Sequence, residues 1–326
     1  MAALSAAPPF STSSSSEEQA ARAWLEAQGF YPGDARSEVT FDGFKRMCPL
    51  ARACESGRLN VCHWLLKAGA DEDLNKTDGD GSTPMLLACE AGHLPVVEWL
   101  FEVGAGADSS TKADKFGCTP MSMACWNGHL PVCECLFKMG AGDHIRKTNR
   151  NGATPLLLAC ETGRLSVCKW LLEVGAAEDI TKCDADGNAP MLRACMNGHL
   201  SVCTWLLEVG ATDDVIKANR NGTTPMHWAC WNGHRSVCEW LYIEGADADI
   251  SKANNCGDTP LHLACWNGHL SVCEWLLQMG AVANDTTKRN KNGETPMILA
   301  CEHNHLPVCE WLFRVGMADD EKEIVA

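Results

Sequence analysis

The sequence predicts an all-α repeat fold, a solenoid of stacked helix pairs joined by β-hairpin or loop fingers. Two observations lead to this prediction. A proline recurs every 35 or 36 residues, and each interval holds two short stretches of helical apolar periodicity. Isolated helices this short are marginal in water, so they must bury their apolar faces against neighbouring units. The register prolines are Pro49, Pro84, Pro120, Pro155, Pro190, Pro225, Pro260 and Pro296.

The clearest copy of the repeat spans residues 254–281. Thr259 precedes Pro260, which suits an N-cap followed by the first residue of a helix. Gly268 is expected to end that helix in a left-handed conformation, and a second helix follows over roughly 269–278. Two other copies have Cys48 and Ala189 in place of the capping threonine, so weaker helix starts are expected there.

Four segments are expected along the chain. Residues 1–16 are small and polar and predict a disordered tail. Residues 17–42 predict a capping helix, with Ser16 as its N-cap, followed by an irregular link. Residues 43–317 form eight repeats without a linker and therefore one domain. Residues 318–326 form an acidic C-terminal tail.

The composition narrows the classes of partner. A formal net charge of −15 argues against nonspecific binding to nucleic acid or to an anionic membrane surface, since both call for basic faces. No apolar run approaches the ~18 residues of a membrane span, and no signal peptide is recognisable. The expectation is a monomer in a reducing intracellular compartment, cytoplasmic or nuclear, that binds neither nucleic acid nor membrane.

Most of the 20 cysteines recur at fixed positions of the repeat. One set occupies a single position of the first helix and another a single position of the second, where Val97 stands in the one remaining repeat. A position that accepts valine requires a small apolar side chain, so these cysteines are predicted to be buried, reduced and free of metal. The two sets are Cys54, Cys89, Cys125, Cys160, Cys195, Cys230, Cys265 and Cys301, and Cys62, Cys133, Cys168, Cys203, Cys238, Cys273 and Cys309.

The stretch TPLHLACWNGHLSVCEWLL resembles the ankyrin repeat, whose signature is T-P-L-H-x-A followed by a second helix. The resemblance covers about residues 43–317, although each unit here exceeds the usual ~33 residues by two or three. The additional residues precede each finger, which is therefore expected to be longer or differently shaped. The resemblance implies a curved stack with outer helices on a convex back and a concave groove that binds other proteins.

The sequence offers little support for catalysis or metal binding. Cys301, His303, His305 and Cys309 are a candidate zinc set, but all except His303 belong to the repeat pattern. The histidines at the interhelical turns, such as His129 and His199, are expected to bond nearby backbone. No nucleophile elbow, phosphate loop or HExxH motif occurs. We therefore expect no enzyme activity, no cofactor and no metal.

Charge and tryptophan placement supply the candidate binding residues. A lysine precedes each finger, and it either binds an acidic ligand or pairs with a nearby acid such as Asp179 or Asp249. An acidic back and a less acidic or basic finger edge are expected.

The first-helix ends carry Trp126, Trp231 and Trp266, where other repeats have glutamate or methionine. The fold does not require tryptophan there, so these rings are candidate partner anchors, although packing on neighbouring first helices remains an alternative. Candidate finger-tip contacts are Arg150, Arg220 and Asn221.

The sequence thus predicts a non-enzymatic scaffold that binds a partner protein in a concave groove. Two alternatives remain open. One is an adaptor or regulatory subunit of an enzyme complex, and the other is a redox- or metal-responsive protein that uses its cysteines.

Overall fold

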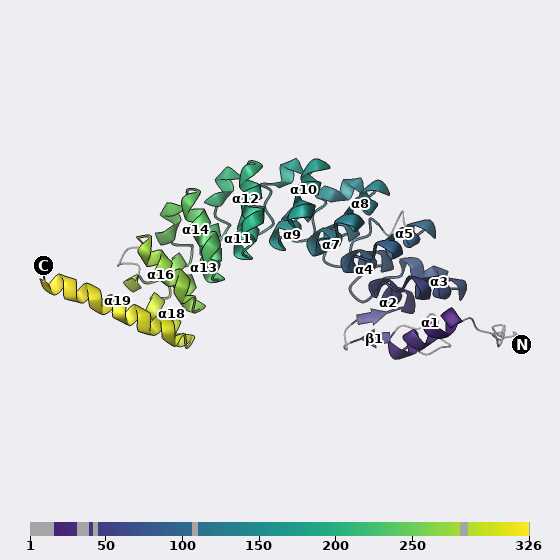
Figure 1. Cartoon of the computed structure of the whole chain (residues 1–326), viewed down its shortest axis with the longest axis horizontal. Helices are drawn as coiled ribbons and strands as arrows, with labels where there is room; N and C mark the ends of the chain where they lie inside the picture. The colour runs from purple at the N-terminus through teal and green to yellow at the C-terminus, as the bar shows by residue number, and fades with distance from the viewer. Residues whose placement is uncertain (1–15, 31–38, 42–44, 106–109, 281–285, 326) are drawn as a thin grey trace, which may run out of the picture.

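The computed structural model describes residues 16–30, 39–41, 45–105, 110–280 and 286–325. Over these residues the chain is a curved stack of helix pairs, which appears as an arch in Figure 1. The first helix of each pair lies on the concave side and the second on the convex side. The structure confirms the predicted all-α solenoid, and its repeats are numbered one to eight by the register prolines.

Each inner helix begins at a register proline, because proline fits the first helical turn and the preceding residue caps it. The cap is visible at Thr83, whose hydroxyl accepts a hydrogen bond from the Leu86 N–H at 3.2 Å. Cys48 and Ala189 make no side-chain cap bond, as expected. The inner helices are α2 (Pro49–Glu55), α4 (Pro84–Ala91), α7 (Pro120–Asn127), α9 (Pro155–Glu161), α11 (Pro190–Met196), α13 (Pro225–Trp231), α15 (Pro260–Trp266) and α18 (Pro296–Glu302).

Each outer helix follows a tight turn, and glycine allows that turn in all but the last repeat. Gly268, for example, has φ +73°, a left-handed conformation that favours glycine, and Asn304 takes this place in repeat eight with φ +60°. The outer helices are α3 (Leu59–Lys67), α5 (Leu94–Glu102), α8 (Leu130–Lys138), α10 (Leu165–Glu173), α12 (Leu200–Glu208), α14 (Arg235–Ile243), α16 (Leu270–Gln278) and α19 (Leu306–Val325).

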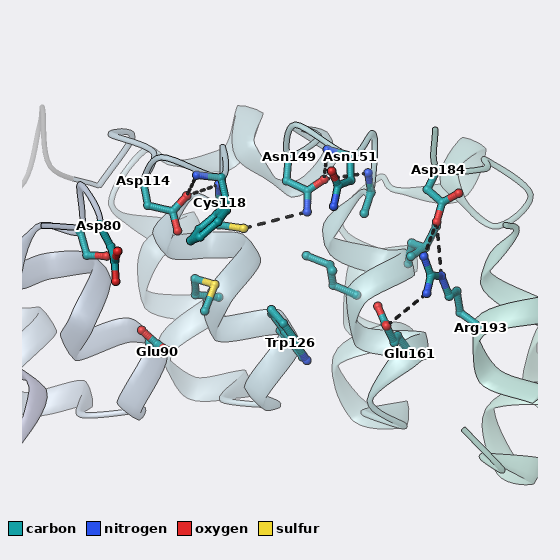
Figure 2. Close-up of a pocket in the computed structure, with 16 residues that line it drawn as sticks. Asp80, Glu90, Asp114, Cys118, Trp126, Asn149, Asn151, Glu161, Asp184 and Arg193 are labelled. Carbon is teal, nitrogen blue, oxygen red and sulfur yellow. Dashed lines mark hydrogen bonds and ion pairs between the residues drawn. The ribbon is translucent and has the colours of Figure 1, made fainter. Parts of the chain in front are cut away.

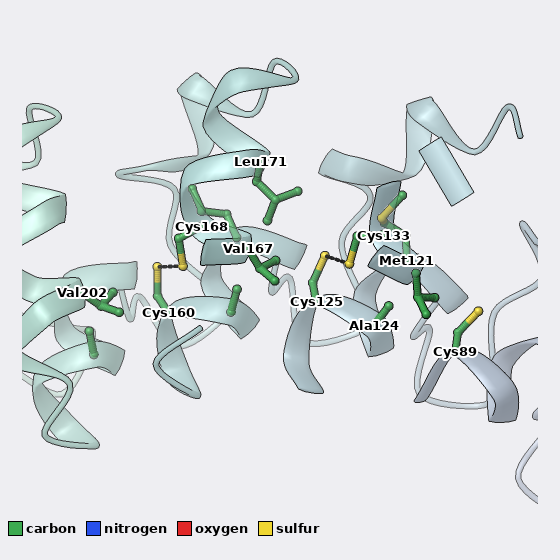
Figure 3. Packing of buried hydrophobic residues seen from close by; sticks show 14 of the residues in the cluster. Cys89, Met121, Ala124, Cys125, Cys133, Cys160, Val167, Cys168, Leu171 and Val202 are labelled. Atoms are coloured by element: carbon green, nitrogen blue, oxygen red, sulfur yellow. Dashed lines mark hydrogen bonds between the residues drawn. The ribbon is translucent and has the colours of Figure 1, made fainter. Parts of the chain in front are cut away.

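One apolar core runs between the inner and outer helices, and most of the cysteines of the two registers lie within it (Figure 3). Cys160 and Cys168 are fully buried, with their sulfur atoms 3.6 Å apart. Cys125 and Cys133 repeat this contact one unit earlier at 3.7 Å. The thiols therefore act as small apolar groups that let the two helices of a repeat approach closely.

In five of the repeats the residues between the outer helix and the next finger form a 3₁₀ turn. These turns are η1 (Asp71–Asn75), η2 (Gly142–Arg146), η3 (Ala177–Asp179), η4 (Thr212–Val215) and η5 (Asp247–Ser251). Several carry a buried aspartate that pairs with the lysine three residues later, as in Asp214–Lys217 at 2.8 Å and Asp249–Lys252 at 3.0 Å. Lys76 and Lys182 pair with Asp73 and Asp179 in the same way at 3.6 Å. These four lysines are thus held by internal ion pairs.

The described fingers are loops rather than paired strands. Asp114 shapes one of them by accepting hydrogen bonds from the N–H groups of Phe116 and Cys118, both at 2.8 Å. Neighbouring fingers are joined through backbone, since the Arg150 N–H donates to the Phe116 carbonyl at 2.9 Å. This bond holds adjacent finger tips side by side along the groove.

The two ends of the stack differ from the repeats. At the N-terminal end, α1 (Ser16–Ala27) packs on α3 through the buried residues Ala21 and Leu25. Part of the predicted irregular link forms an antiparallel pair, β1 (Val39–Phe41) and β2 (Lys45–Met47). At the C-terminal end α19 continues to Val325, so the acidic segment from residue 318 is helical. Residues 1–15 of the predicted disordered tail lie outside the described residues, and the predicted segment boundaries stay predictions.

Candidate functional site

A cavity of about 530 Å³ opens between the finger tips and the inner helices of repeats two to five (Figure 2). Its upper edge comes from finger tips and its lower edge from the C-terminal parts of inner helices. The polar and aromatic residues of the finger tips are Asp80, Ser82, Asp114, Phe116, Asn149, Asn151 and Asp184. The corresponding residues of the inner helices are Glu90, Trp126, Glu161 and Arg193.

The floor of the cavity is apolar and separate from the main core. Two small clusters of buried side chains lie beneath the fingers. They provide an apolar surface between the polar edges, which suits a pocket that orders a ligand through a few polar contacts. The floor residues are Cys118, Met123, Ala153, Leu157 and Leu158.

Trp126 is fixed at its backbone and open at its ring. Its carbonyl accepts hydrogen bonds from the hydroxyl of Thr162 and from Nε of Arg164 at 3.3 Å. Trp126 remains 38% exposed, and Phe116, which lines the same cavity, is 57% exposed. In Figure 2 the indole stands between Glu90 and Glu161, which occupy the same position in the adjacent repeats. The site predicted at Trp126 is therefore an accessible ring in a cavity.

Carboxylates dominate the charge of the cavity. Five carboxylates line it together with one guanidinium, that of Arg193. Arg193 pairs with Asp184 at 2.7 Å and with Glu161 at 3.5 Å. Burial alone would raise the pKa of Asp184, but hydrogen bonds from Arg193 and Asn188 outweigh it and hold that pKa below its ordinary value. Asp184 is thus ionised at neutral pH, and the acids of the cavity outnumber its single lining base.

Lys115 contributes a second cation at the rim. Its Nζ pairs with Asp80 and lies 5.0 Å from the centre of the Phe116 ring. Even with this lysine counted, the five carboxylates exceed the cations by three. Two of these carboxylates, Glu90 and Glu161, belong to inner helices, so the predicted less acidic or basic finger edge stays a prediction.

Trp231 and Trp266 have a different environment in repeats six and seven. Their ring centroids lie 5.5 Å apart, so the residues predicted to form one patch do come together. Trp228 meets Trp231 edge-on at 6.4 Å, and His303 stacks on Trp266 at 4.9 Å. Both Trp231 and Trp266 are half-buried. This aromatic stack, Trp228–Trp231–Trp266–His303, supports the packing alternative for these two rings while leaving part of each exposed.

The predicted finger-tip residues are exposed but do not converge on one point. Arg150 lines a shallow hollow of about 330 Å³ with Lys115 and Phe116, beside the Trp126 cavity. Arg220 and Asn221 lie on the finger of repeat six, and their carbonyls accept hydrogen bonds from Asn255 of the next finger, from its side-chain amide and its backbone N–H respectively. The structure thus places Arg150 near Trp126, and Arg220 and Asn221 two repeats beyond Arg150.

Sequence reasoning missed Arg193 and Trp228. Both occupy one inner-helix position, where Leu87, Met123 and Leu158 stand in other repeats. In the sequence, a charged residue or a large ring at a position that is aliphatic in other repeats could have indicated that these two residues have a special role. Their roles depend on neighbouring repeats, since Arg193 pairs with Glu161 and Trp228 meets Trp231.

The histidines of the interhelical turns are structural. Nε2 of His129 lies 3.0 Å from the Glu90 carbonyl, and that of His305 lies 2.8 Å from the Trp266 carbonyl. Each such bond satisfies a backbone carbonyl at the C-terminal end of the inner helix in the previous repeat. Burial lowers the pKa of His199, which favours its neutral form. Within the described residues no three His, Cys, Asp or Glu side chains are grouped to hold a metal ion.

The last cysteine pair differs from the others. Burial raises the pKa of the Cys125 and Cys160 thiols well above their ordinary range, which leaves little reactive thiolate. Cys301 by contrast is exposed and Cys309 half-buried, with their sulfurs 3.1 Å apart. Burial also raises the pKa of Cys309, to about 11. The predicted burial of the cysteines in the two registers therefore fails in repeat eight.

Comparison with known families agrees with this geometry. The family model described as ankyrin repeats (3 copies) matches six overlapping stretches of the chain, which together extend from residue 31 to residue 322. The stretches are residues 31–113, 50–148, 105–182, 142–217, 176–252 and 237–322. A search of curated proteins found no match. None of the described helices has the length and hydropathy to span a membrane.

Proposed function

Because the chain belongs to the ankyrin repeat family, whose members are generally protein–protein interaction modules and typically not enzymes, we propose that it is a non-enzymatic scaffold that binds a partner protein in its concave groove. The observation that carries the proposal is Trp126, an exposed ring in a preformed cavity on the concave side. Tryptophan is enriched among interface residues whose truncation costs ~2 kcal/mol or more. The chain acts as a monomer and binds neither nucleic acid nor membrane, in keeping with its net charge of −15.

The partner extends along the groove from Trp126 to the aromatic stack. It contacts Trp126 and Arg150 in repeats three and four, and the exposed parts of Trp231 and Trp266 further along. Arg220 and Asn221 border the second contact from their finger tip. The exposed positions of all three finger-tip residues support this assignment. The chain works in a reducing intracellular compartment, where its many free cysteines stay reduced.

Site-directed photo-crosslinking tests the proposal. A benzophenone side chain is placed at position 126 or 220 on the concave side, and at 243 on the convex side as the control. Ile243 is 77% exposed at the end of an outer helix, so that substitution does not disturb the core. On irradiation in extracts of the source cells, positions 126 and 220 should yield the same protein adduct and position 243 none. Adducts from position 243 alone, or from no position, contradict groove binding.

A further inference from the structure

Seven of the eight repeats place one cysteine on the inner helix and one on the outer helix, eight residues apart. In six of these repeats both thiols are fully buried and their sulfur atoms lie 3.5–3.8 Å apart, as for Cys160 and Cys168 in Figure 3. In repeat eight the sulfurs of Cys301 and Cys309 are closer, at 3.1 Å, and this pair is open to solvent. The same contact between thiols thus occurs once at an accessible place.

The exposure of this pair follows from its place at the end of the stack. In repeat seven the next helix pair covers Cys265 and Cys273, since α18 packs on α15 and α19 on α16. In the described part of the chain no further helix pair lies beyond α18 and α19 (Figure 1). Small oxidants therefore reach Cys301 and Cys309 in the folded chain, whereas the buried pairs must wait for local unfolding.

The two thiols of repeat eight have unequal environments. Cys301 is the more exposed, and susceptibility to oxidation follows exposure. Burial and the neighbouring Cys301 thiol raise the pKa of Cys309 to about 11, so Cys309 is protonated at neutral pH. The sulfurs need to approach by about 1 Å, since a disulfide holds them about 2.05 Å apart. Cys301 is therefore placed to be oxidised first, with Cys309 beside it to complete the bond.

We propose that Cys301 and Cys309 are a modification site, at which hydrogen peroxide converts the two thiols to a reversible disulfide within the chain. The Cys301 thiolate attacks the O–O bond and becomes a sulfenic acid, and the departing hydroxide takes up the proton that Cys301 released. The Cys309 sulfur then attacks the Cys301 sulfur, and its proton leaves with the hydroxyl group as a second water. Two thiols and one peroxide thus give one disulfide and two waters, and a thiol reductant restores the pair. This inference is independent of the proposed groove function.

The chain offers two matched controls. Cys230 and Cys238 occupy the same two positions in repeat six, with sulfurs 3.6 Å apart, but both are fully buried. Cys256 is exposed on the finger of repeat seven, and in the described part of the chain no hydrogen bond joins it to a second thiol. The first control has the contact without access, and the second has access without the contact.

The test treats the reduced full chain with hydrogen peroxide, alkylates the remaining thiols in denaturant and analyses tryptic peptides by mass spectrometry. The peptide of residues 292–314 carries both Cys301 and Cys309, and it should lose two hydrogen atoms and resist alkylation. Cleavage after Glu302 should leave its parts joined until dithiothreitol is added. The separate peptides that carry Cys230 and Cys238 should stay unlinked and fully alkylated.

Dimedone, which traps sulfenic acids, tests the order of the two steps. In Cys309→Ser the sulfenic acid of Cys301 has no partner, so its dimedone adduct should rise at least roughly tenfold over that of the wild type. The Cys256 adduct should be equal in the two proteins, and circular dichroism verifies that the variant keeps its fold.

Three results would overturn the proposal. One is a wild-type chain in which Cys301 and Cys309 form no bridge, or form bridges only between chains. Another is a bridge between Cys230 and Cys238 that forms as fast as the one in repeat eight, because access would then not decide which pair is oxidised. The third is a Cys301 dimedone adduct as abundant in the wild type as in Cys309→Ser. The bridging measurements need no variant and therefore decide the proposal by themselves.

Discussion

The cavity region, repeats two to five, and the aromatic region, repeats six to eight, use one inner-helix position in opposite ways. Trp126 has a glutamate at this position in both adjacent repeats, and its ring is left open beside a cavity. Trp231 and Trp266 are each other's neighbours, and their rings pack together. The exposure of a groove residue is therefore decided by the same position in the flanking repeats.

The largest expected contrast between the two regions is in thiol reactivity. Cys160 and Cys168, in the cavity region, are buried in the core, whereas Cys301 in repeat eight is exposed. Under native conditions iodoacetamide should modify Cys301 at least ~100-fold faster, because an interior thiol must wait for its repeat to open. Mass spectrometry of digests taken over time measures each rate. Comparable rates for Cys160 and Cys301 would support the alternative that the cysteines of both helix positions respond to redox conditions.

The next effect is on stability. The double variant Trp231→Glu/Trp266→Glu removes three ring contacts of the aromatic stack, each worth about 0.5–1.5 kcal/mol beyond the area it buries. The free energy of unfolding in urea should fall by about 2–4 kcal/mol. Trp126→Glu installs the residue of the adjacent repeats at an open site and should cost less than about 1 kcal/mol. Equal losses would mean that the two regions do not differ in packing.

A smaller contrast concerns pH. His227 is fully buried in the aromatic region, and burial lowers its pKa from 6.5 to about 4, whereas Leu157 holds this position in the cavity region. In the unfolded chain the imidazole of His227 is protonated below about pH 6.5, whereas in the folded chain it stays neutral down to about pH 4. Stability is therefore full above pH 6.5 and is lost as the pH falls towards 4.

The variant His227→Leu separates this histidine from the others. Between pH 7.5 and pH 5 the wild-type chain should lose on the order of 2 kcal/mol more unfolding free energy than the variant. The variant keeps the threonine cap, since Thr83 caps Leu86 in the same arrangement. Urea unfolding at the two pH values measures the difference. Parallel losses in both proteins would show that His227 does not titrate differently in the folded and unfolded chains.

The positions of the helices could be predicted from the sequence, but the cavity could not. Pro49 and its counterparts mark the start of every inner helix, because proline and threonine act locally at a helix N-terminus. Asp80, Asp114 and Asp184 belong to three different fingers, and only the stacking of the repeats brings them to one opening. Cys301 shows the same limit. It shares its register with buried cysteines, yet its exposure depends on what packs beside it.

The most direct test of the account is ¹⁹F NMR of the chain labelled with 5-fluorotryptophan. Trp126→Phe, Trp231→Phe and Trp266→Phe assign the three resonances. Trp126 should show the largest shift on exchange from H₂O to D₂O, since its ring is the most exposed of the three. A Trp126 resonance as protected as that of Trp231 would contradict the account.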